Sequence, residues 1–124
     1  MKTEVFPAGA RPIGPYSPGV SASSMVFCSG QLGTDPKSGE LALGVAAQTA
    51  AAIVNMKGVL EAAGLGLGNV VKVTVFMADL SEFDEMNREY SKHFKPPYPA
   101  RSTVGVAALP KSARVEIECI ASRE

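Results

Sequence analysis

A few polar residues in unusual settings could bind a small carboxylic acid and move protons on it. Arg101 follows a Pro-Ala pair at the start of an apolar run, so its guanidinium would emerge from a rigid edge. That geometry suits two parallel hydrogen bonds to a carboxylate. Glu116 and Glu118 alternate along a later segment, and two carboxylates roughly 7 Å apart could work as a catalytic pair. The other candidates are Tyr16 in a proline-rich loop, Ser29 before a glycine, and Asn87 in a helical segment.

Each of these residues also has an ordinary structural explanation. Arg101 could equally form a salt bridge with Glu116 or Glu118. Those two carboxylates could simply face solvent, which the alternating pattern alone favours. Tyr16 could be a packing aromatic and Asn87 a solvent-facing side chain. No single residue therefore decides the chemistry.

Common catalytic and cofactor motifs are missing from the sequence. There is no GxxxxGK[ST] phosphate loop, and the glycine cluster at residues 64–68 has Asn69 in place of the last glycine of a dinucleotide motif. His93 is the only histidine, and neither cysteine lies near it in sequence, so zinc-ligand spacing is absent. We therefore expect no metal and no cofactor, and we expect His93 to be a solvated surface group instead of a catalyst.

Composition narrows the classes of protein. A chain of 124 residues with 46% apolar content predicts one domain, residues 1–124, with one ordinary core. Twelve basic residues balance twelve acidic ones, which argues against nucleic acid or an anionic membrane surface as a partner. The apolar runs are far shorter than the roughly 20 residues of a membrane span, and residues 1–9 lack signal-peptide features, so we expect the cytoplasm.

Cys28 and Cys119 lie in apolar runs and are expected to be buried thiols.

Alternating strand-like and helix-like segments must position the candidate residues. The patterns predict strands at residues 4–6, 25–29, 70–77, 102–107 and 114–122, with a loop at 7–18. The alanine-rich segment 44–63 predicts a long helix capped by Gly64. A second helix is expected after Ser81, where SEFD approximates a capping box, and before the Pro-Pro pair at 96–97. Its apolar face carries Phe83, Met86, Tyr90 and Phe94.

This order of elements predicts an α+β sandwich, a mixed sheet with two helices packed on one face. The last two strands are expected to pair as neighbours. In the final strand one face, with Val115, Ile117, Cys119 and Ala121, would pack under the helices. The opposite face carries Glu116, Glu118 and Ile120, and the chain has no third helix to cover it. That face must meet either water or another copy of the chain.

Longer motifs then occur in order along the chain. They are IGPYS at 13–17, SGQ at 29–31, PKSGE at 36–40, NMK at 55–57, LEAAG at 60–64, VVKVTVF at 70–76, YPARS at 98–102, ALPK at 108–111 and VEIE at 115–118. With them the chain resembles the RidA (YjgF) family over essentially its whole length. The resemblance implies a chorismate-mutase-like fold and a homotrimer whose active sites lie in clefts between subunits.

The resemblance also assigns roles to the candidates. Arg101 would hold the substrate carboxylate, and Glu116 would position water and assist proton transfer. Tyr16 and Asn87 would line the cleft, and Ser29 would contact the substrate. Many members have a cysteine two residues after the arginine, whereas this chain has Thr103, which we count among the substrate-binding residues.

The implied activity is 2-iminobutanoate/2-iminopropanoate deamination, the hydrolysis of reactive enamines and imines such as 2-aminoacrylate and 2-aminocrotonate to 2-keto acids and ammonia. It requires no cofactor. Three alternatives stay open: a ribonuclease or translation inhibitor, against which the balanced charge argues; a non-catalytic ligand-binding or chaperone-like trimer; and a specialised deaminase with a differently shaped pocket.

Overall fold

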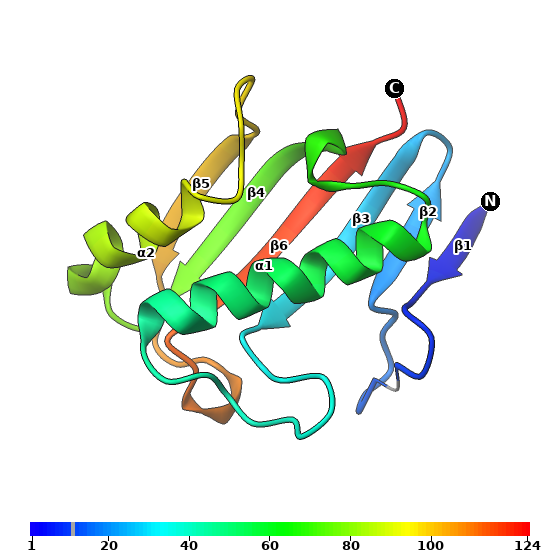
Figure 1. Ribbon diagram of the computed structural model, residues 1–124. Helices are drawn as coiled ribbons and strands as arrows, with labels where there is room; N and C mark the ends of the chain where they lie inside the picture. Colours follow the sequence, from blue (N-terminus) through cyan, green and yellow to red (C-terminus); the bar gives the residue numbers. More distant parts are fainter. Residues whose placement is uncertain (11) are drawn as a thin grey trace.

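The computed structural model, which describes residues 1–10 and 12–124, is a six-stranded mixed sheet with two helices on one face (Figure 1). The sheet has the order β1-β2-β3-β6-β4-β5. Its strands are β1 (Lys2–Val5), β2 (Gly19–Ala22), β3 (Met25–Leu32), β4 (Val70–Met77), β5 (Ala100–Gly105) and β6 (Val115–Ser122). The helices are α1 (Val45–Ala62) and α2 (Phe83–Tyr90). The predicted α+β class and the single helical layer are confirmed.

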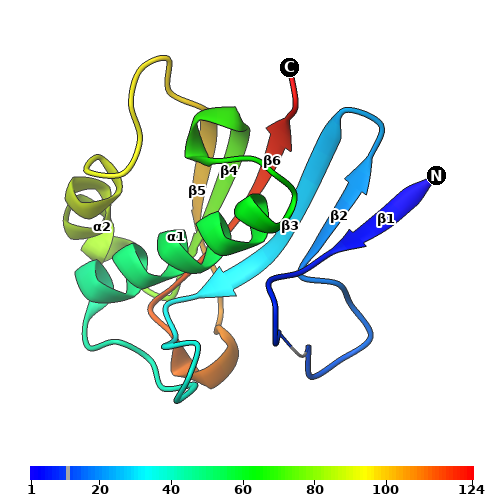
Figure 2. The same cartoon turned by 45° about the vertical axis from the view of Figure 1, so that its right-hand side comes forward.

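Helix α1 forms where the alanine-rich segment was expected. Its buried residues recur every three or four positions and rest on β3 and β6, so one side of the helix closes the core. The helix ends because Gly64 adopts φ of +79°, a left-handed conformation that glycine tolerates. Figure 2 shows both helices on the same side of the sheet, with the other side open. None of the described helices is long and apolar enough to cross a membrane.

The prediction that the last two strands pair with each other is wrong. Strand β4 lies between them: it pairs in parallel with β5 and antiparallel with β6. The reason is the connection through α2, because a strand-helix-strand crossover returns the chain parallel to the strand it left. Strand β6 then fills the remaining position between β3 and β4.

Element boundaries also differ from the pattern. Strand β2 was missed because its four residues, GVSA, carry little alternation. Strand β3 runs past Gly30, where the sequence suggested an end, because the register shifts between Cys28 and Gln31 and the bulge accommodates the glycine. The capping box at Ser81 is absent. Instead the Asp79 carboxylate accepts the Ser81 N–H and begins a 3₁₀ turn, η2 (Leu80–Glu82), ahead of α2.

Helix α1 lies very close to the backbone at Gly33, the residue after β3. A Cβ atom on Gly33 would overlap the backbone of Gln48, which leaves no room for any side chain. At this close approach the Gln48 side chain forms two hydrogen bonds: its amide N–H donates to the Ala42 carbonyl, and its oxygen accepts the Arg114 N–H. The contact therefore fixes how near the helix lies to the sheet.

We predict that Gly33→Ala lowers the free energy of unfolding by about 1–3 kcal/mol, because the methyl group must displace backbone. Gly66→Ala is the matched control, since Gly66 has an extended φ of −141° and its Cβ would meet no atom within 4 Å. Urea denaturation of both variants tests this. Equal stability of the two would show that the helix can shift without cost.

Candidate active site

Arg101 lies on β5, at the edge of the sheet, and points to the side covered by helices. Its register partner on β4 is Val73, which is fully buried in the core, so the two side chains share a face. The guanidinium carbon lies 4.6 Å from the centre of the Tyr90 ring and 5.7 Å from that of Phe83. None of the ion pairs among the described residues includes Arg101. The guanidinium therefore has donors available for a carboxylate.

Thr103 and Asn87 lie in the same region. Thr103 is two residues after Arg101 on one strand, so it points the same way, and its hydroxyl is buried without a partner in the described part of the chain. Asn87 is half-buried in α2, one helical turn after Phe83 and one turn before Tyr90. Arg101, Thr103 and Asn87 are called the arginine group below.

Glu116 lies on β6 and points to the open face of the sheet. Its carboxylate rests on Gly30 of β3, in the space that a Cβ atom at residue 30 would fill. Burial against this backbone raises the pKa of Glu116, and the charge of Glu118, two residues along the same face, adds to the rise. Glu118 itself is exposed. The two carboxylates share a face as expected, but only the Glu116 side chain is partly buried.

Ser29 and Tyr16 gather near Gly30. The Ser29 hydroxyl donates to the Ser17 carbonyl at 2.6 Å, and the Ser29 N–H donates to the Pro18 carbonyl at 2.9 Å, which fastens the proline-rich loop to β3. Tyr16 is half-exposed and lines, together with Gly30, a cavity of about 430 Å³ between this loop, the end of β3 and α1. Glu116, Ser29 and Tyr16 are called the glutamate group below.

Arg101 and Glu116 lie on opposite faces of the sheet within one protomer. Val73 is the register partner of both Arg101 and Cys119, so those side chains share the helix-covered face. Glu116 is three residues from Cys119, an odd number of steps, and therefore points away from it. This placement excludes a salt bridge from Arg101 to Glu116 or Glu118 inside one chain. It also means that a single protomer does not bring all the candidate residues together.

Two neighbours of Arg101 were not among the expected site residues. Tyr90 and Phe83 were assigned to the packing stripe of the second helix, and both do contact the core. The Arg101 guanidinium also lies over both of their rings. Only the tertiary fold, which brings the Arg101 side chain over these two rings, could have revealed this second contact.

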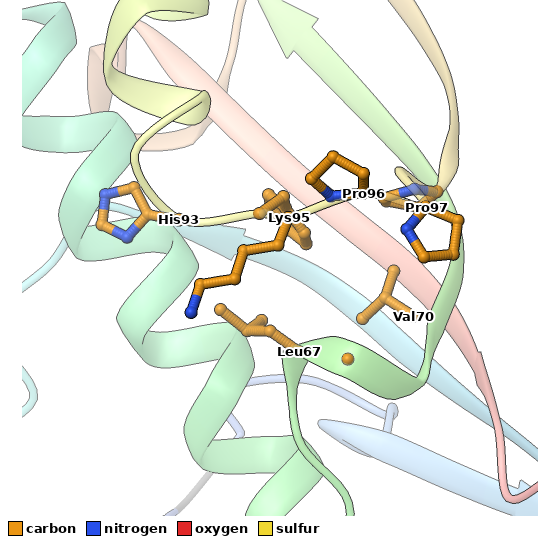
Figure 3. A pocket seen from close by; sticks show the side chains of 9 residues that line it. Leu67, Val70, His93, Lys95, Pro96 and Pro97 are labelled. Atoms are coloured by element: carbon orange, nitrogen blue, oxygen red, sulfur yellow. The ribbon is translucent and has the colours of Figure 1, made fainter.

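A second cavity, of about 320 Å³, contains none of the candidate residues (Figure 3). It lies between the start of β4 and the segment after α2, and Figure 3 shows the Lys95 side chain extending between His93 and Leu67. His93 is not the solvated group we expected. It is half-buried and bonds the Glu89 carboxylate at 2.9 Å, and this bond is the main cause that lowers the pKa of Glu89.

The two cysteines lie in the core of the protein. Cys28 and Cys119 are buried free thiols directly opposite each other on β3 and β6, which confirms that they behave as core residues. Within residues 1–10 and 12–124, no cluster of three or more His, Cys, Asp or Glu side chains could hold a metal ion.

Comparison with known proteins identifies the family. The family model described as Endoribonuclease L-PSP matches residues 8–123. The chain belongs to this family, the RidA family.

One named relative and two solved structures are similar to the chain over nearly its full length. The 2-iminobutanoate/2-iminopropanoate deaminase of Salmonella typhimurium is 48% identical, over 99% of this chain and 96% of the relative. The structure of RidA from an Antarctic Psychrobacter has a TM-score of 0.87 and 44% identity, covering 97% of this chain and 95% of its own. The structure of Escherichia coli TdcF with bound serine has a TM-score of 0.89 and 41% identity, covering 98% and 99%.

Because the pKa of Glu116 is raised, we predict that the free energy of unfolding depends on pH through this residue. Because the folded protein holds this proton more tightly than the unfolded chain, the stability that it contributes is complete below the ordinary glutamate value of 4.5. It is lost as the pH rises through the pKa of the folded state. Glu116→Gln imitates the protonated carboxyl, so its free energy of unfolding should gain on that of wild type through this window and then level off.

Urea unfolding between about pH 4 and pH 8 measures the difference. Glu118→Gln is the companion variant: it removes the smaller cause and should reduce only part of the effect. A difference between Glu116→Gln and wild type that stays constant with pH would contradict the prediction.

Proposed function

We propose that this RidA-family protein is a 2-iminobutanoate/2-iminopropanoate deaminase, which hydrolyses reactive enamines and imines of amino acids to 2-keto acids and ammonium. The observation that carries the proposal is Arg101, which forms no ion pair within the described part of the chain, beside the buried Thr103 hydroxyl, which has no hydrogen-bond partner there. An arrangement of this kind suits a small ligand with a carboxylate and a further polar atom. Similarity to a deaminase of that name, 48% identity over 99% of this chain, supports it.

The candidate site residues would each have a separate role in the reaction. Arg101 would bind the substrate carboxylate through two hydrogen bonds, with Thr103 and Asn87 beside it. Glu116, whose pKa is raised, would hold the water that attacks C2 of the imine. Acting on the protonated imine, it would take one proton from that water as the oxygen–carbon bond forms and return it to the nitrogen. As the carbon–nitrogen bond breaks, the hydroxyl proton of the adduct would pass by way of Glu116 to the departing ammonia, which leaves the 2-keto acid and ammonium. Tyr16 and Ser29 would line the opposite wall.

We propose further that the site is completed between subunits of a homotrimer, with the chain as one domain. Arg101 and Glu116 lie on opposite faces, so one substrate can reach both only if two copies contribute. The open face offers a surface for this contact, since Phe27 and Val104 expose about two fifths of their area there, at 43% and 41%. Strand β5 of one subunit would then adjoin the glutamate group of the next.

We predict that Arg101→Ala lowers kcat/KM at least about 100-fold, because two charge-assisted hydrogen bonds are lost. The assay is release of 2-keto acid from 2-aminoacrylate, generated in place by a serine dehydratase, compared with dehydratase alone. Arg88→Ala, an exposed arginine of α2, is the matched control. Wild type no faster than the dehydratase alone would refute the deaminase, and an active Arg101→Ala would refute the anchor.

A mixing experiment tests the shared site. Arg101→Ala and Glu116→Gln should each be inactive alone. Unfolded together, refolded and assayed as one sample, they should recover about a quarter of wild-type activity, because about a quarter of the interfaces then join an intact Arg101 to an intact Glu116. No recovery, from a sample that forms mixed trimers, would show that both residues act within one subunit.

A further inference from the structure

The arginine group contains an unusual feature, a guanidinium held by rings instead of by a carboxylate. Arg101 lies over the faces of Tyr90 and Phe83, with its guanidinium carbon 4.6 Å and 5.7 Å from the two ring centres. A cation within about 6 Å of an aromatic face is attracted by the negative face of the ring. The rings thus fix the charge without using its hydrogen-bond donors.

Tyr90 is itself rigidly placed. It is 6% exposed, and Phe94, which lies beyond the end of α2 and not on the helix as the sequence suggested, stacks on it with ring centres 4.6 Å apart and planes inclined by 24°. Phe83 is half-buried on the same stripe of α2. The two rings therefore form a preformed base under the guanidinium, called the aromatic base below.

The Tyr90 hydroxyl does not explain why a tyrosine occupies this position. It is buried and lacks a hydrogen-bond partner among the described residues. An unpartnered buried hydroxyl costs stability, so the fold gains nothing from it. Burial raises the pKa of Tyr90 and the nearby Arg101 charge opposes that rise, so the hydroxyl as well as the ring lies beside the guanidinium. The Tyr90→Phe variant separates the two.

A carboxylate in place of the rings would hold Arg101 equally well, but it would compete with the substrate. The incoming carboxylate would then have to displace a partner of the same charge, at the cost of an existing pair of hydrogen bonds. Aromatic faces avoid this competition. They also limit the rotation of the guanidinium plane, so less freedom is lost when a carboxylate binds.

We propose that Tyr90 and Phe83 are positioning residues of the deaminase, whose ring faces hold Arg101 ready for the substrate carboxylate. The inference rests on the proposed function, since it assumes that Arg101 binds that carboxylate. Substrate binding should depend on the aromatic base, whereas the steps after binding should not.

The test separates KM from kcat in the coupled 2-aminoacrylate assay. Tyr90→Leu should raise KM between about 2-fold and 30-fold, the range expected for loss of a cation–π contact, with kcat within about twofold of wild type. Inhibition by the product class, with 2-oxobutanoate as the probe, should weaken by the same factor. Tyr90→Phe keeps the ring and should restore both values.

Met86→Ala is the control for lost packing. It shortens a fully buried side chain of α2 that is not part of the aromatic base. Its KM should stay within about twofold of wild type, while its thermal stability falls as much as that of Tyr90→Leu. If Tyr90→Leu does not fold, Phe83→Leu replaces it, with a smaller rise in KM because the Phe83 ring is the more distant one.

The outcomes distinguish this inference from the function on which it rests. An inactive wild type refutes the deaminase, and an active Arg101→Ala refutes the anchor, and the inference falls with either. If both hold and Tyr90→Leu binds substrate and 2-oxobutanoate like wild type, the aromatic base is refuted. A Tyr90→Phe variant as weak as Tyr90→Leu would likewise overturn it, because the hydroxyl would then be the important group.

Discussion

Side chains alternate between the two faces of a β-sheet, and in this protein only one face has helices to cover it. This constraint decides which side chains are buried and which are left outside. Residues that are apolar at alternate positions of β4 and β6 form the core beneath α1. The residues between them face outward, whatever their chemistry. The separation of Arg101 from Glu116 results from the same rule.

The parts of the fold that depend on local pattern could be predicted from the sequence. Alternation in β6 gave the correct face to each of its residues, and the alanine-rich segment ended at the left-handed Gly64 as expected. Strand order was harder, because it depends on contacts between segments far apart in the chain. Pairing the last two strands with each other ignored the crossover through α2, which reserves the position beside β4 for β5.

The chemistry of the site was partly visible as well. Arg101 at the entrance of an edge strand and Glu116 on an uncovered face were both recognisable from their neighbours in sequence. What the sequence could not provide was the partner of each side chain. The contact of Arg101 with Tyr90 depends on where the tertiary fold places these two side chains, and the raised pKa of Glu116 depends on its approach to the backbone of β3. Both are tertiary effects, set by packing and not by pattern.

The carboxylate of Glu116 occupies the place that a side chain at residue 30 would take. A glycine on one strand is thus part of the environment of an ionisable group on another. For anyone who redesigns this protein, residue 30 is not an independent position in a mutant library. Any larger residue there would displace the Glu116 carboxylate although residue 116 itself is unchanged. The effects of such a substitution would therefore imitate those of a mutation at residue 116.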